Sequence, residues 1–138
     1  MSRILVAVSS PQASERAVVP VADLASRLDA EVLVVHVTRP SGTSNGSSQS
    51  DRGEQAVRTL GDKIRAKGVS VQTLLMFSDD VAQAILATAE ERNASLILLG
   101  LTNKGVFQRI VAGNVPVELL RNTKVPVLLL PPDYRETL

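Results

Sequence analysis

Five short apolar runs, separated by segments with helical periodicity, place the strongest constraint on what this chain can fold into. Four of the runs consist almost entirely of Val, Leu and Ile, as expected of parallel strands buried on both faces. The runs are Ile4–Val8, Glu31–Val37, Val69–Met76, Leu96–Gly100 and Val125–Leu130. Strands that alternate with helices form right-handed βαβ units. The pattern therefore predicts an α/β fold with a five-stranded parallel sheet covered on both faces.

The segments between the runs predict four helices, with two local irregularities. Pro20 lies inside the first segment, where it should kink or delay the helix at a cost of about 3 kcal/mol unless neighbouring contacts compensate. Residues 40–50 are rich in Ser and Gly, which predicts a flexible surface loop before the second helix. The length of 138 residues and the lack of an internal repeat predict a single domain, 1–138.

Composition narrows the classes of function. The chain has no cysteine, one histidine and a formal net charge of +1, which argues against thiolate chemistry, His-rich metal sites and a phosphate-backbone footprint for nucleic acid. Two Phe, one Tyr and no Trp offer no base-stacking platform. No apolar run approaches the roughly 20 residues of a membrane span, and no signal-peptide pattern begins the chain. We therefore expect a cytoplasmic protein that binds neither nucleic acid nor membrane.

A Gly-spaced loop follows the fourth apolar run. In a doubly wound sheet of order 3-2-1-4-5, strand order reverses between the first and fourth strands, and ligands bind beyond the carboxyl ends of the strands at that point. The Ser9–Pro11 turn and the Gly100–Gly113 loop would then share one crevice. Glycines let the backbone approach phosphate, and the helix that follows offers free N–H groups. The loop therefore predicts an anion site.

Five motifs in order resemble the universal stress protein (UspA-like) family, from about Arg3 to Pro131. They are Ile4–Val8 before a Ser/Pro turn, Val34–Val37, Leu98–Gly100, Gly113–Val115 and Val125–Pro131. The resemblance implies a flavodoxin-like (adenine-nucleotide α-hydrolase-like) three-layer sandwich, frequent dimers, and ATP binding in one subgroup.

The ATP-binding subgroup of that family is similar to G-x2-G-x9-G-(S/T), preceded by an Asp after the first strand. Gly100 and Gly113 keep the spacing, whereas Asn103 and Asn114 replace the second Gly and the Ser or Thr. Asn tolerates left-handed backbone and caps helices, so both asparagines retain part of the required geometry. Ser9 stands at the Asp position, and a hydroxyl does not replace the paired acceptors of a carboxylate.

The resemblance thus implies weak binding of ATP, ADP or AMP, with Mg²⁺, through a degenerate loop. Val8 and Val37 would flank the base, and loop glycines and the start of the fourth helix would hold ribose and phosphates. The predicted binding residues are Val8, Ser9, Val37, Gly100, Asn103, Gly105, Gly113, Asn114 and Val115. No general base, nucleophile or metal-ligand set converges on the crevice, so we expect no enzyme activity beyond weak ATP hydrolysis.

Other polar residues favour structural roles. His36 ends a buried strand without an acidic neighbour in sequence, which favours a hydrogen-bonded structural role over catalysis. Asp79 and Asp80 precede a helix and favour N-capping over metal binding. Ser9 and Ser10 favour helix capping before Pro11 over ligand contact.

The last apolar run adds a prediction about partners. It would form a sheet edge without charged side chains, and such edges associate. We expect a homodimer through this strand, as in the resembled family, involving Val125, Val127, Leu128, Leu129 and Leu130. Two functions remain open. One is a stress-response protein that binds an adenine nucleotide. The other is a dimeric interaction module without nucleotide, or the soluble regulatory domain of a membrane transporter.

Overall fold

The computed structural model describes residues 2–9, 11–39, 46–100, 115–131 and 134–138, and within residues 46–50 it describes the backbone alone. Strands and helices alternate along these residues, as predicted. The strands are β1 (Ser2–Ala7), β2 (Ala30–Thr38), β3 (Val71–Phe77), β4 (Leu96–Gly100) and β5 (Val127–Leu130). The helices are α1 (Pro11–Leu28), α2 (Gly46–Arg65), α3 (Val81–Glu91) and α4 (Val115–Asn122).

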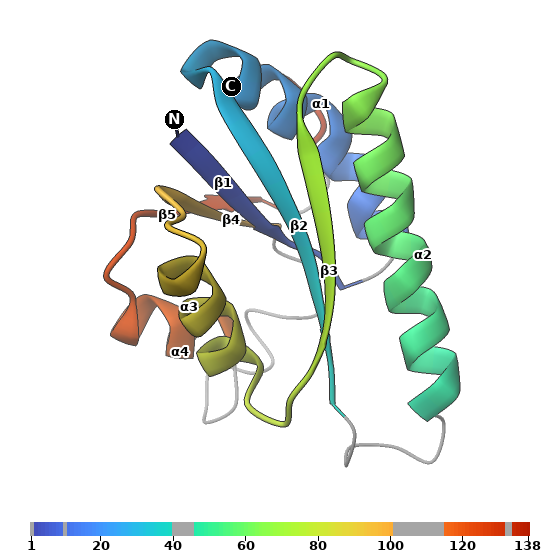
Figure 1. Cartoon of the computed structure of the whole chain (residues 1–138), viewed down its shortest axis with the longest axis vertical. Coiled ribbons are helices and arrows are strands. Elements are labelled where there is room, and N and C mark those ends of the chain that lie inside the picture. Colours follow the sequence, from blue (N-terminus) through green and yellow to red (C-terminus); the bar gives the residue numbers. More distant parts are fainter. Residues whose placement is uncertain (1, 10, 40–45, 101–114, 132–133) are drawn as a thin grey trace.

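All five strands join one parallel sheet in the order β3-β2-β1-β4-β5, which confirms the predicted order. The reversal of strand order places β1 between β2 and β4. Helices α1 and α2 cover one face of the sheet, and α3 and α4 cover the other (Figure 1). The protein therefore has the three-layer α/β architecture expected of a doubly wound sheet.

Alternation along the strands divides the core into two clusters. Ile4 and Val6 of β1 pack with Val18 and Val21 of α1 on one side of the sheet. Leu5 lies between them in sequence and packs on the other side, against Ile85 of α3. Because successive side chains of a strand point to opposite faces, a strand between two helical layers must be apolar at nearly every position. This explains the continuous apolar runs in the sequence.

The second helix begins earlier than predicted. Residues 40–50 were expected to form a loop, yet α2 starts at Gly46, so 46–50 belong to the helix; residues 40–45 lie outside the described residues. Ser and Gly favour loops by local preference, but most helical stability in proteins comes from burial of an apolar face. Ala56, Leu60 and Ile64 of α2 are fully buried against the sheet, which provides that burial.

Pro20 does not delay the first helix. Helix α1 begins at Pro11 and continues through Pro20 to Leu28. Pro11 occupies the start of the helix, where its fixed φ is favourable and its missing N–H costs little. Pro20 is buried, so its ring contributes apolar contact at the position where it removes a backbone hydrogen bond.

Candidate functional site

The carboxyl ends of β1, β2 and β4 meet at the edge of the sheet where the ligand crevice was predicted. Ala7, the last residue of β1, is in register with Val35 of β2 and Leu99 of β4. Val8 continues this alignment, because its N–H donates to the carbonyl of Val35 at 3.0 Å. The β1 end is therefore held between the two neighbouring strands, and Gly100 lies at the end of the adjacent strand.

His36 fixes the exit of the chain from β1. Its Nδ1 donates to the carbonyl oxygen of Val8 at 2.8 Å, and the residue is only 9% exposed. A carbonyl oxygen can only accept, so the hydrogen of this bond lies on Nδ1. The predicted structural role of His36 as a hydrogen-bonded residue is thus confirmed.

Gly53 of α2 makes room for the His36 ring, a relationship that the sequence did not reveal. A Cβ added at Gly53 would lie 2.1 Å from Cδ2 and 2.4 Å from Nε2 of His36. Only a residue without a side chain fits against the imidazole there. A glycine inside a helix lowers stability by up to about 1 kcal/mol relative to alanine. An unfavourable residue within a helical segment was therefore the signal in the sequence that a close contact requires glycine at this position.

The predicted binding residues that the structure describes divide between the two faces of the sheet. Val8 is 7% exposed and packs in the cluster beneath α1 and α2. Val37 and Val115 are half-buried, and both pack against the cluster beneath α3 and α4. The structure therefore brings Val37 and the start of α4 to the same side of the sheet, whereas the Val8 side chain lies on the other side.

Gly100 ends β4 in an exposed position. A Cβ added there would meet no described heavy atom within 4 Å, and its φ lies outside the left-handed region. Ser9 is also exposed. Val8, Ser9, Val37, Gly100 and Val115 carry no formal charge, so the described residues of the predicted site offer apolar side chains, one hydroxyl and backbone groups rather than ionic contacts.

The remaining predicted site residues lie outside the described residues. These are Asn103, Gly105, Gly113 and Asn114. Ser10, one of the two expected capping residues before α1, also lies outside.

Asp80 caps α3. Its carboxylate accepts a hydrogen bond from the N–H of Gln83 at 3.1 Å, which confirms the predicted N-cap. In the described part of the chain, no group of three or more His, Cys, Asp or Glu is placed to hold a metal ion. Likewise, none of the described helices combines the length and apolarity needed to cross a bilayer.

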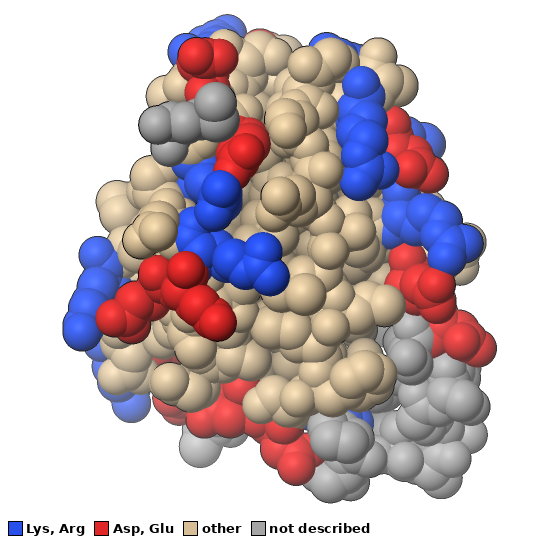
Figure 2. All heavy atoms as spheres, viewed as in Figure 1, with Lys and Arg blue, Asp and Glu red and all other residues tan. Residues whose placement is uncertain are grey.

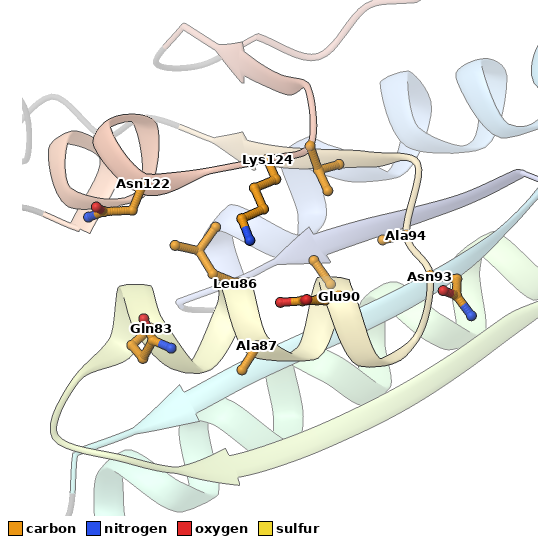
Figure 3. A pocket seen from close by; sticks show the side chains of 10 residues that line it. Gln83, Leu86, Ala87, Glu90, Asn93, Ala94, Asn122 and Lys124 are labelled. Carbon is orange, nitrogen blue, oxygen red and sulfur yellow. The ribbon is translucent and has the colours of Figure 1, made fainter.

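A separate cleft of about 480 Å³ lies between α3 and the segment that leads into β5. Figure 3 shows Lys124 directed toward α3, near Leu86 and Glu90. Asn93 and Ala94, which precede β4, also line it. The cleft thus opens at the amino ends of β4 and β5 and is distinct from the predicted crevice at their carboxyl ends.

Comparison with known proteins agrees with the fold described above. The model of the universal stress protein family matches residues 1–131. The chain belongs to the universal stress protein family. This membership confirms the resemblance inferred from the five sequence motifs.

Two curated proteins show the range of this family relationship. The chain is 27% identical over 124 residues to a universal stress protein of Methanocaldococcus jannaschii, which covers 83% of this chain and 72% of that protein. It is 33% identical over 108 residues to the sensor protein KdpD of Mycobacterium tuberculosis. That alignment covers 78% of this chain but only 12% of KdpD.

Solved structures of the family share the fold. A universal stress protein from Archaeoglobus fulgidus superposes with a TM-score of 0.75 at 21% identity, covering 94% of this chain and 98% of that one. The A. fulgidus protein in complex with dAMP gives 0.72 at 21% identity, with 94% and 97% covered. A universal stress protein in complex with cAMP gives 0.70 at 18% identity, with 94% and 96% covered.

Proposed function

We propose that this universal stress protein binds an adenine nucleotide in the crevice at the carboxyl ends of β1 and β4. The observation that carries the proposal is the exposed Gly100 at the end of β4, beside the β1 exit that His36 fixes. This is the topological switch point, where doubly wound sheets bind ligands. The family structures that contain dAMP and cAMP support a nucleoside monophosphate as the core of the ligand.

Val37 is proposed to contact the base. Its half-buried side chain lies on the same side of the sheet as Val115, at the start of α4. The Val8 side chain is buried on the opposite side, so Val8 would contribute its backbone. In this arrangement the positive end of the α4 dipole favours the phosphate, and Mg²⁺ would accompany a di- or triphosphate.

We propose binding without efficient turnover. The described residues of the proposed crevice include no general base that would activate the Ser9 hydroxyl or a water molecule, and positioning alone gives slow hydrolysis. The protein would then act by presenting a nucleotide-dependent surface rather than by consuming its ligand.

The test is calorimetric titration of AMP, cAMP and ATP, the last with and without Mg²⁺, into the wild-type chain and two variants. Gly100→Asp introduces a carboxylate where no described atom would clash, and Gly100→Ala introduces a methyl group at the same place. We expect saturable binding to the wild type, at least tenfold weaker binding to Gly100→Asp, and a smaller loss for Gly100→Ala. Equal affinities for all three proteins, or no heat up to millimolar nucleotide, would contradict the proposal.

The second candidate function is a regulatory domain that acts without nucleotide. The 33% identity to a 12% portion of the sensor protein KdpD supports it, because there a related segment belongs to a much longer sensor protein. The same titration separates the two functions. Absence of binding, with the fold intact by circular dichroism, would favour the nucleotide-independent domain.

The homodimer through β5 remains a proposal. β5 is an edge strand, and its residues Val127, Leu128 and Leu129 are half-buried. Replacing Leu129 by Lys and measuring the mass by sedimentation tests it: loss of β5 pairing would lower the mass of the assembly, and an unchanged mass would contradict it.

A further inference from the structure

The opposite edge of the sheet, β3, is more exposed than β5. Leu75 and Phe77 are 37% and 63% exposed, and Val71–Phe77 contains no charged residue and no proline. Natural proteins usually protect an edge strand with charge, proline or a bulge, because its backbone is a template for another strand. β3 contains neither a charged residue nor a proline, so its edge is suited to strand pairing.

The hydrogen bonds at the two ends of β3 show which of its backbone groups face outward. Val32 N–H donates to the carbonyl of Ser70, and Ser78 N–H donates to the carbonyl of Thr38, both at 2.9 Å. In a parallel ladder, alternate residues bond the same neighbour. The even-numbered residues thus bond β2, and the odd-numbered residues from Val71 to Phe77 direct their N–H and C=O groups away from the sheet.

Four charged residues of α2 run alongside this edge, and we call them the α2 charge stripe. They alternate in sign along the helix: Glu54, Arg58, Asp62 and Arg65. Together with Thr73, Leu74 and Leu75 they line a cleft of about 290 Å³. Figure 2 shows positive and negative side chains alternating on the α2 side, beside an uncharged band over β3.

Helix α2 and strand β3 run in opposite directions, and the midpoint of the α2 charge stripe is level with the midpoint of β3. Arg65 donates to the carbonyl of Val71, at the beginning of β3, and Gly61 lies against Thr73. Glu54, at the other end of the stripe, is therefore level with the end of β3. The midpoint of the stripe, between Arg58 and Asp62, lies near the midpoint of the strand at Leu74.

We propose that a second copy of this chain pairs with β3 about a two-fold axis at Leu74, with the two β3 strands antiparallel. The two-fold rotation places the two α2 helices antiparallel, with their charge stripes side by side. Glu54 then faces Arg65 of the second copy, and Arg58 faces Asp62 of the second copy. Each contact brings opposite charges together. A surface that is complementary to itself in this way is the requirement of an isologous dimer.

The same axis matches the backbone and side chains of the strands. Odd-numbered residues then oppose odd-numbered residues, so that the outward N–H and C=O groups of Thr73 and Leu75 meet, whereas the Val71 carbonyl already accepts a hydrogen bond from Arg65. Thr73 lies opposite Leu75 of the second copy, and Val71 lies opposite Phe77 of the second copy. Pairs of aromatic or aliphatic side chains with β-branched ones stabilise paired strands. The exposed side chains of Leu75 and Phe77 thereby become covered.

This dimer leaves the proposed nucleotide crevice open and does not depend on it. Because the two sheets run antiparallel across the axis, their carboxyl edges lie on opposite sides of the assembly. The two joined sheets form one continuous sheet through the β3 strands.

Cysteine cross-linking tests the register directly, because the chain has no cysteine of its own. Leu74 is the residue that opposes itself, in a non-hydrogen-bonded pair about 4.5 Å apart between Cα atoms, which is within disulfide range. We expect Leu74→Cys to form a covalent dimer on mild oxidation, and the matched Gln72→Cys, which opposes Met76 of the second copy, to remain unlinked. Equal linking of both variants, or of neither, would overturn the proposal.

A charge swap tests the stripe and separates β3 from β5. In sedimentation velocity of the Leu129→Lys background, in which any β5 pairing is removed, Arg58→Glu should weaken the β3 dimer by about tenfold, and Arg58→Glu combined with Asp62→Arg should restore it. Leu75→Lys should dissociate it, whereas Val19→Lys, at a comparably exposed apolar residue of α1, should not. A Leu129→Lys chain that is monomeric throughout, a swap that fails to restore association, or a dimer of unchanged affinity after Leu75→Lys would overturn the proposal.

Discussion

Nδ1 of His36 lies 2.8 Å from the carbonyl oxygen of Val8, and this hydrogen bond joins β2 to the exit of β1. It is buried, so its loss would leave an unpaired carbonyl next to the proposed crevice, at a cost of about 1–3 kcal/mol. Gly53 supports it from α2 by leaving space for the ring. The position of the β1 exit therefore depends on a contact between three different elements.

Gly53→Ala should destabilise the protein by about 1–3 kcal/mol, because the added methyl group would overlap the His36 ring. The loss is expected even though alanine is the better helix former. The free energy of unfolding from urea titration measures it.

The control for this prediction is the same substitution in a His36→Ala background. Without the ring there is no overlap, so Gly53→Ala should then be neutral or stabilising. An equal loss in both backgrounds would show that the His36–Gly53 contact is not the cause.

Ser14→Ala should lower the free energy of unfolding by about 1 kcal/mol. Ser14 is fully buried, and its Oγ donates to the carbonyl of Ala56 at 2.7 Å, which links α1 to α2. Chemical denaturation of the two proteins measures the difference. Unchanged stability would mean that the hydroxyl contributes no net energy at this helix contact.

Asp80→Ala should destabilise the protein by about 1 kcal/mol, because α3 loses the acceptor for the Gln83 N–H. Asp80→Asn keeps a side-chain oxygen at the same place and should retain most of the stability. Thermal unfolding of the three proteins provides the comparison, and equal losses for both variants would assign the effect to charge rather than to capping.

Arg3→Ala should cost about 1–2 kcal/mol. The Arg3 guanidinium is partly buried, pairs with Glu31 of β2 and donates to the carbonyl of Arg92, the C-cap of α3. Lys63→Ala, which removes an exposed pair with Glu15, should cost less than 1 kcal/mol. Urea titration of both variants measures the contrast, and similar losses would contradict the special role of Arg3.

The three-layer architecture was predictable because burial between two helical layers leaves a signature in the sequence. The runs at Ile4–Val8 and Leu96–Gly100 are apolar at nearly every position, which only strands covered on both faces require. Boundaries were less predictable. β3 begins at Val71 rather than Val69, and α2 begins within the Ser-rich segment, because strand and helix ends depend on neighbours that local preference does not include.

The site was predictable only in outline. Its place at the ends of β1 and β4 followed from strand order, and Gly100 lies there. The separation of Val8 and Val37 onto opposite faces was not anticipated, because it depends on where each strand ends and on the alternation of side chains beyond that point.

The sequence by itself determined the layered α/β architecture, the order of its strands and the family to which the chain belongs, because periodic burial and ordered motifs are properties of the chain. The tertiary structure alone decided that Gly53 accommodates His36 and that the α2 charge stripe lies beside the exposed β3 edge. These relationships join residues on different elements, and only packing of the helices on the sheet fixes their distance and direction.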